Sequence, residues 1–92
     1  MTFRREETLE RVELLLKDWR KEISKKNASG YVKDIIKSLH NLQIAVCIKE
    51  SLERREKRAS SFYRLISVDP GLSESELGKK TIQIFSDYAK SR

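Results

Sequence analysis

The sequence predicts an all-α protein, and three observations lead to this prediction. Apolar residues recur at spacings of three and four along most of the 92 residues. Only one Pro and three Gly interrupt the pattern. Hydrophobic residues make up 38% of the chain and charged residues 37%, which is too apolar and too periodic for a disordered segment. We therefore expect one helical domain over residues 1–92, a compact bundle of three to four helices with a long central helix.

The first helix is expected over residues 4–26. Its apolar stripe consists of Leu9, Val12, Leu16, Trp19 and Ile23. Alternating steps of three and four suit packing at a shallow angle against another helix. Asn27 is expected to end this helix, and either Ser29 or Gly30 is expected to cap the next. So short a loop makes the first two helices antiparallel neighbours.

Residues 31–67 carry two apolar stripes on different sides of the predicted helix. The first stripe consists of Tyr31, Val32, Ile35, Ile36, Leu39, Leu42 and Val46. The second stripe consists of Ile44, Ile48, Leu52, Ala59, Phe62, Tyr63 and Ile66. No Gly or Pro lies between Tyr31 and Val68, which favours one long helix with a bend. Two helices broken near residues 59–61 are the alternative.

The last helix follows a turn at residues 69–71, where Pro fixes its own φ and Gly allows a positive φ. Ser73 is expected as its N-cap, and Glu76 completes a capping box three residues later. The expected buried stripe consists of Leu77, Thr81, Ile84, Phe85 and Tyr88. This helix is expected to end near residue 90.

The net charge of +6 is concentrated in the middle of the chain. Residues 14–68 carry thirteen basic and six acidic side chains, whereas basic and acidic residues nearly balance on either side. This distribution favours an anionic partner in contact with the middle of the chain. The alternative is a solvated surface rich in Lys, Arg and Glu.

We do not expect an enzyme, a cofactor or a metal site. His40 and Cys47 are the only histidine and cysteine, and seven residues on one helix separate them by about 10 Å, too far for a nucleophile–base pair. A single cysteine fits a reducing, cytoplasmic setting. No apolar run approaches the roughly 20 residues that span a bilayer, so we expect no membrane partner.

Two basic clusters are the candidate nucleic-acid-binding sites. The arginine face consists of Arg54, Arg55, Lys57, Arg58 and Arg64. The lysine pole contains Lys25, Lys26 and Lys33, with Arg20, Lys21 and Lys37 nearby. Most of the arginine face follows one side of a helix over about 15 Å, a reach that matches several phosphates of a strand. Glu50, Glu53 and Glu56 can instead neutralise this face internally.

The run 52–57, Leu-Glu-Arg-Arg-Glu-Lys, is followed by a capped helix that opens Ser-Glu-Ser-Glu-Leu at residues 73–77. This arrangement resembles the helical domain of GINS replication proteins over residues 31–88. In that family, a helix with an Arg-x-x-Lys element packs in a small bundle that serves as a scaffold at the replication fork. Arg58 departs from the family pattern, which tends to place an aliphatic residue there.

Together, the charge pattern and the resemblance predict a non-catalytic accessory subunit of a nucleic-acid-processing complex. The resemblance implies DNA replication, in a polymerase or helicase assembly. We expect contact with the phosphate backbone of DNA or RNA, without sequence specificity, inside a larger protein complex. The competing hypothesis is a protein–protein adaptor or homodimer whose basic face pairs with an acidic partner. Helical small subunits of RNA-guided defence complexes share this size and charge and are a further class.

Overall fold

Four long helices and one short helix make up the described part of the chain. The computed structural model describes residues 5–25 and 30–90. The helices are α1 (Arg5–Ile23), α2 (Tyr31–Cys47), α3 (Leu52–Ser67), α4 (Pro70–Ser73) and α5 (Glu76–Lys90). No strand occurs among these residues. The all-α prediction is therefore confirmed.

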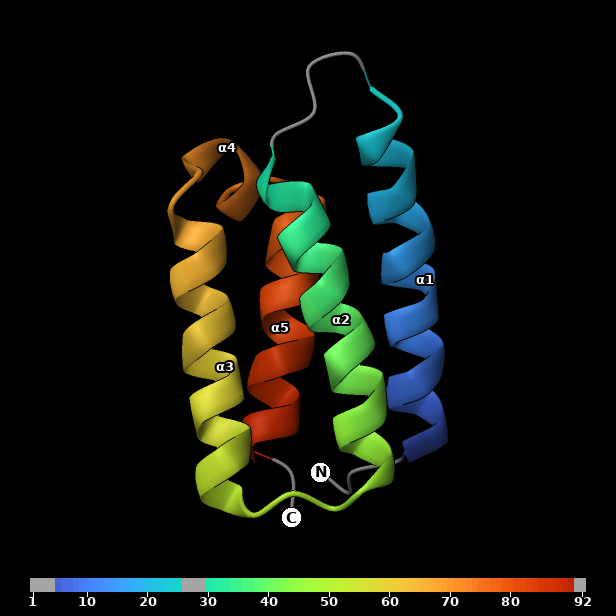
Figure 1. Ribbon diagram of the computed structural model, residues 1–92, viewed down its shortest axis with the longest axis vertical. Coiled ribbons are helices and arrows are strands. Elements are labelled where there is room, and N and C mark those ends of the chain that lie inside the picture. Colours follow the sequence, from blue (N-terminus) through green and yellow to red (C-terminus); the bar gives the residue numbers. More distant parts are fainter. Residues whose placement is uncertain (1–4, 26–29, 91–92) are drawn as a thin grey trace.

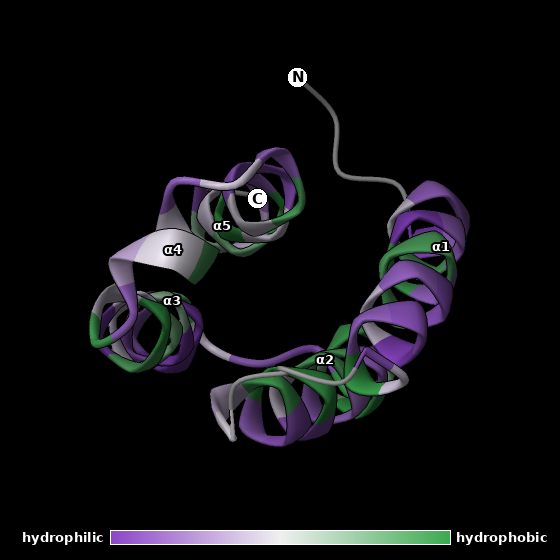
Figure 2. Ribbon diagram, turned by 90° about the horizontal axis from the view of Figure 1, so that it is seen from above, coloured by the Kyte–Doolittle hydropathy of each residue, from purple (hydrophilic) through white to green (hydrophobic). Residues whose placement is uncertain are grey.

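The four long helices run alternately up and down (Figure 1). Seen along the bundle, they surround a shared interior in the order α1, α2, α3, α5 (Figure 2). Each neighbouring pair in this ring is in contact, including α1 with α5. The predicted antiparallel pairing of the first two helices is therefore confirmed, and α5 closes the ring.

One hydrophobic core fills the interior of this ring. Its buried residues are Val12, Leu15, Leu16, Trp19, Val32, Ile35, Leu39, Leu42, Ala45, Val46, Phe62, Ile66, Ile84, Phe85 and Tyr88. The stripe predicted for the last helix lies here as expected, with Leu77 partly buried at its edge. Most of the stripe predicted for the first helix is also buried, although Ile23 at its end is 38% exposed.

The predicted long central helix is wrong. The chain leaves α2 after Cys47 and starts α3 at Leu52. Lys49 has φ 48°, the left-handed conformation that commonly follows the end of a helix. Ser51 then caps α3, because its hydroxyl accepts a hydrogen bond from the backbone N–H of Arg54 at 3.3 Å. The alternative break near residues 59–61 is not found either, since α3 continues through them.

This turn explains why the apolar stripe changes sides along residues 31–67. After the reversal, most of the first stripe on α2 and part of the second stripe on α3 face one core, so Leu39 and Ile66 are both fully buried, whereas Tyr63 of the second stripe is 58% exposed. The part of the second stripe that lies around the turn stays outside: Ile44 is 62% exposed, Ile48 60% and Leu52 52%.

The capping box predicted at Ser73 and Glu76 is also wrong. Asp69 accepts a hydrogen bond from the backbone N–H of Gly71 and starts the short helix α4, which ends at Ser73. Ser75 caps α5 instead, because its Oγ accepts from the Gly78 N–H at 3.0 Å. The two helices approach closely here: a Cβ on Gly78 would lie 1.8 Å from the Leu72 carbonyl oxygen.

A buried hydrogen bond joins α1 to α5 across the core. The indole Nε1–H of Trp19 donates to Thr81 Oγ1 at 2.9 Å, and that hydroxyl donates to the Leu77 carbonyl at 2.7 Å. Trp19 is 1% exposed and Thr81 0%. Because water does not reach this indole, Thr81 is needed to satisfy its N–H.

We expect Thr81→Val to lower the free energy of unfolding by about 1–3 kcal/mol, because the buried indole N–H loses its acceptor. Urea denaturation followed by circular dichroism measures this loss. In a Trp19→Phe background the indole is absent, so Thr81→Val is expected to lower the free energy of unfolding by a smaller amount. Equal losses in both backgrounds would contradict the role given to this hydrogen bond.

Candidate nucleic-acid interface

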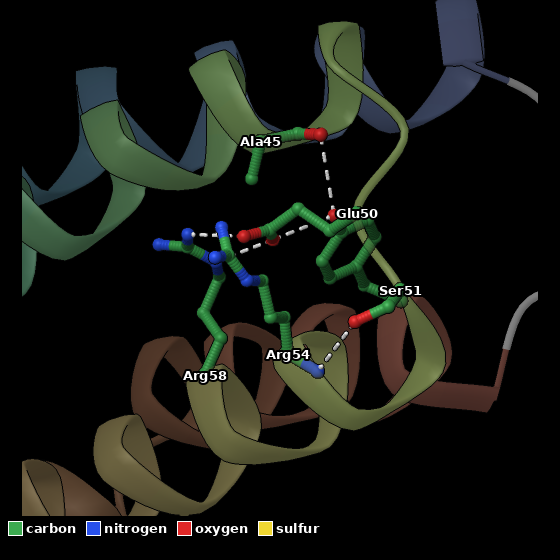
Figure 3. Close-up of polar contacts among 6 residues, drawn as sticks. Ala45, Glu50, Ser51, Arg54 and Arg58 are labelled. Atoms are coloured by element: carbon green, nitrogen blue, oxygen red, sulfur yellow. Dashed lines mark hydrogen bonds and ion pairs between the residues drawn. The ribbon is translucent and has the colours of Figure 1, made fainter.

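The turn between α2 and α3 contains a carboxylate that ties three helices together (Figure 3). The Glu50 side chain is only 5% exposed. Arg58 of α3 donates from Nε to Glu50 Oε1 at 2.9 Å and from Nη2 to Oε2 at 2.8 Å. Two parallel bonds of this kind form the strongest geometry between these groups. The hydroxyl of Tyr88 on α5 lies 2.9 Å from Glu50 Oε1 and 3.2 Å from the Ala45 carbonyl oxygen at the end of α2.

The protonation states of this cluster follow from its contacts. The hydrogen bonds from Arg58 lower the pKa of Glu50, and they outweigh the desolvation that favours its neutral form. Burial, followed by the hydrogen bond to Glu50, raises the pKa of Tyr88 to about 12. At neutral pH, Glu50 is therefore charged and Tyr88 remains a hydrogen-bond donor.

Two residues of the arginine face are thus used by the fold. Arg58 is held by Glu50, across a separation of eight residues that spans the turn. The half-buried Arg55 lies with its guanidinium carbon 6.0 Å from the centre of the Tyr88 ring, a cation–π arrangement. The internal neutralisation expected from the glutamates therefore occurs at Glu50. It makes Arg58 and Arg55 parts of the bundle.

The other three residues of the arginine face are exposed on α3. The side chains of Arg54, Lys57 and Arg64 make no hydrogen bond or ion pair with the rest of the described chain. Arg54 and Arg58 extend side by side from α3 toward Glu50 (Figure 3). The charge of Arg54 helps to lower the pKa of Glu50, so two guanidinium groups surround one carboxylate and leave an excess of positive charge.

The lysine pole is less organised than the arginine face. Lys25 forms an exposed ion pair with Glu22 at 2.9 Å, and such pairs contribute little. Lys33 is exposed on the first turns of α2. Lys26 lies outside the described residues. Arg20 instead approaches His40, with 3.5 Å between Nη2 and Nε2, so it contacts α2 from α1.

A groove of about 540 Å³ lies between α2 and α3. Its lining residues are Ser38, Asn41, Glu50, Arg54, Lys57, Arg58, Ser61, Phe62, Leu65 and Phe85. The sequence did not predict Ser38 and Asn41 as site residues, because they come next to α3 only once the chain reverses. The cap at Ser51 was the local signal for that reversal.

Wild-type protein is expected to lose stability between pH 10 and about 12, because Tyr88 ionises near pH 10.0 when unfolded and at about 12 when folded. Over this range the unfolded state releases the proton first, so rising pH favours unfolding. Melting temperatures of wild type and Tyr88→Phe across this range test the effect. The variant is expected to show a shallower decline.

Tyr63→Phe is the matched control, since Tyr63 is 58% exposed and its loss should leave the wild-type alkaline decline unchanged. Equal declines in wild type and in Tyr88→Phe would contradict the raised pKa of the Tyr88 hydroxyl, which burial and the hydrogen bond to Glu50 cause.

Comparisons of the chain with protein-family models, curated proteins and solved structures found no match. The resemblance to GINS helical domains therefore stays a prediction. Within residues 5–25 and 30–90, no three His, Cys, Asp or Glu side chains are grouped to hold a metal ion. No helix of that same part combines the length and the apolar character needed to cross a membrane.

Proposed function

We propose that this protein is a non-catalytic nucleic-acid-binding subunit that holds a phosphate backbone against α3. The observation that supports this most strongly is the set of three exposed cations, Arg54, Lys57 and Arg64, whose side chains make no hydrogen bond or ion pair with the described residues, although the charge of Arg54 also acts on Glu50. A cation that is held in a hydrogen bond or ion pair would have to break that interaction to bind phosphate, whereas these three side chains would not.

The spacing of the three cations suits a backbone. Arg54 and Lys57 lie one turn apart, and Arg64 follows two turns later, so together they span about 15 Å of helix. One strand of a duplex advances about 3.4 Å per phosphate along its axis, so this span faces several phosphates. Contacts to phosphate provide affinity and carry no direct sequence information. Binding is therefore expected to be strong at low salt and indifferent to sequence.

The neighbouring helix extends the basic surface. Lys33 and Lys37 lie one turn apart on α2, and both are exposed. Asn41, one further turn along the same row, lines the groove beside the arginine face. A strand held on α3 would therefore find additional positive charge on α2. The lysine pole contributes to the same interface mainly through Lys33.

A protein partner is the second candidate, and the turn between α2 and α3 favours it. Three aliphatic side chains within nine residues are more than half exposed: Ile44, Ile48 and Leu52. Exposed apolar side chains that form a patch are typical of contact surfaces, and these three lie close together in the sequence. Both roles are compatible with one accessory subunit, which would dock on a larger protein through these apolar side chains and bind nucleic acid through its basic surface. Its assignment to DNA replication rests only on the likeness to GINS proteins.

Reversing the three exposed cations (Arg54→Glu, Lys57→Glu and Arg64→Glu together) is expected to weaken binding of labelled DNA or RNA by at least tenfold at low salt. Each lost phosphate contact should also reduce the slope of log affinity against log salt by about one. Fluorescence anisotropy at several salt concentrations measures both quantities.

The matched control reverses Lys17, Lys79 and Lys80, three exposed lysines on α1 and α5, which changes the net charge equally. Equal losses in both triple variants would mean that net charge alone drives binding. If the wild type binds neither DNA nor RNA at low salt, the proposed nucleic-acid role is wrong. An acidic protein would then be the expected partner of the basic face.

A further inference from the structure

We propose that the groove between α2 and α3 receives one unpaired nucleotide, with its phosphate at the end near the turn and its base toward Ser38 and Ser61. This deepens the proposed function, on which it rests, by naming the form of nucleic acid as single-stranded. The same chemistry is offered by a free mononucleotide, so both probes belong in the test.

The end of the groove near the turn is cationic. Arg54, Lys57 and Arg58 line it together with Glu50. The carboxylate is already held by two hydrogen bonds from Arg58 at 2.8 and 2.9 Å. Arg54 and Lys57 therefore remain as the donors for an added phosphate. Because the guanidinium of Arg54 is a planar fork, it can bind two phosphate oxygens at once.

The other end of the groove is neutral and lined by small polar side chains. In an antiparallel pair, residues equally far from the turn face each other, which places Ser38 of α2 opposite Ser61 of α3. Ser38 Oγ donates to the Asp34 carbonyl at 2.9 Å, so its oxygen is left as an acceptor for a ligand. Asn41, which the same rule places opposite Arg58 between the two ends of the groove, offers both a donor and an acceptor. Such groups can bind the edge of a base.

The length and volume of the groove fit one nucleotide. Arg54 and Ser61 are separated by about 10 Å of helix, comparable with the reach from a phosphate to the far edge of its base. The volume of about 540 Å³ lies within the range of about 300–1,000 Å³ typical of small-molecule sites. A base that is stacked and paired in a duplex cannot enter such a groove, whereas an unpaired base can.

The aromatic rings of the groove act as its floor. Phe62 and Phe85 stack on each other, with centroids 4.1 Å apart and planes 6° from parallel, and each is only 2% exposed. A base would therefore lie over Leu65 and the edges of these rings, without being sandwiched between exposed rings. Since exposed stacking platforms add much of the affinity for single strands, we expect modest affinity and little preference among bases.

Two neighbouring serines on α3 give a matched test. Both serines are exposed on α3, but Ser61 lines the groove and Ser60 is not part of the lining. Ser61→Phe should fill the groove, and Ser60→Phe makes the same chemical change outside it. The probes are single-stranded oligothymidylate and oligouridylate, a blunt DNA duplex, and thymidine monophosphate.

For Ser61→Phe we expect at least tenfold weaker binding of the single strands and of thymidine monophosphate, with duplex binding unchanged. Ser60→Phe should bind every probe within twofold of wild type. Equal single-strand affinity in the two variants would overturn the assignment of the nucleotide to the groove. The proposed function would still hold in that case if duplex binding depends on Arg54, Lys57 and Arg64. If the wild type binds no probe at low salt, both are wrong.

A second measurement on the wild type keeps the test decisive if Ser61→Phe does not fold. Amide chemical shifts recorded by NMR during titration with thymidine monophosphate, and separately with oligothymidylate, should move at Ser38, Asn41 and Ser61. Shifts with both probes would assign the site to the nucleotide unit itself, and shifts with the oligonucleotide alone would assign it to a strand. Shifts confined to Arg64 and other residues outside the lining would contradict occupancy of the groove.

Discussion

The bundle depends most on one buried carboxylate in the turn between α2 and α3. Because a charged group that is 5% exposed must be fully paired, Glu50 determines what surrounds it. Arg58 satisfies both carboxylate oxygens from α3, and the Tyr88 hydroxyl reaches the same carboxylate from α5. That hydroxyl also lies within hydrogen-bond distance of the Ala45 carbonyl at the end of α2. One side chain thus sets the positions of three helices relative to one another.

This pairing also divides the basic residues of α3 between structure and surface. Once Arg58 is bound to Glu50 and Arg55 lies over Tyr88, Arg54, Lys57 and Arg64 remain on the exposed side. The aromatic side of α3 packs against α5 through the stacked Phe62 and Phe85, while a groove stays open toward α2. The proposed backbone contact and the proposed nucleotide site are therefore neighbouring parts of one surface, which the turn brings together.

The parts of the fold that the sequence predicted correctly are those set by local periodicity. The helical class, the first helix and the buried stripe of α5 all follow from steps of three and four. The turn was missed because it uses Lys49 at φ 48°, so neither Gly nor Pro marks it, and the change of stripe was interpreted as a bend. In the candidate site, the glutamates predicted a paired arginine, but the contact between Glu50 and Arg58 crosses a turn, and helical spacing cannot show such a contact. Ser38 and Asn41 were missed for the same reason.

Arg58 stabilises the fold, whereas Arg54 is available to bind nucleic acid. Comparing Arg58→Gln with Arg54→Gln tests this difference most directly. For each variant, urea denaturation gives the free energy of unfolding, and fluorescence anisotropy under native conditions gives the affinity for a single strand. Arg58→Gln is expected to lower the free energy of unfolding by about 1–3 kcal/mol, because it leaves the Glu50 charge poorly paired. Arg54→Gln is expected to change that quantity by less than about 0.5 kcal/mol and to weaken binding more than Arg58→Gln does. Equal stability losses, or a greater loss of affinity in Arg58→Gln, would contradict this division of the arginines.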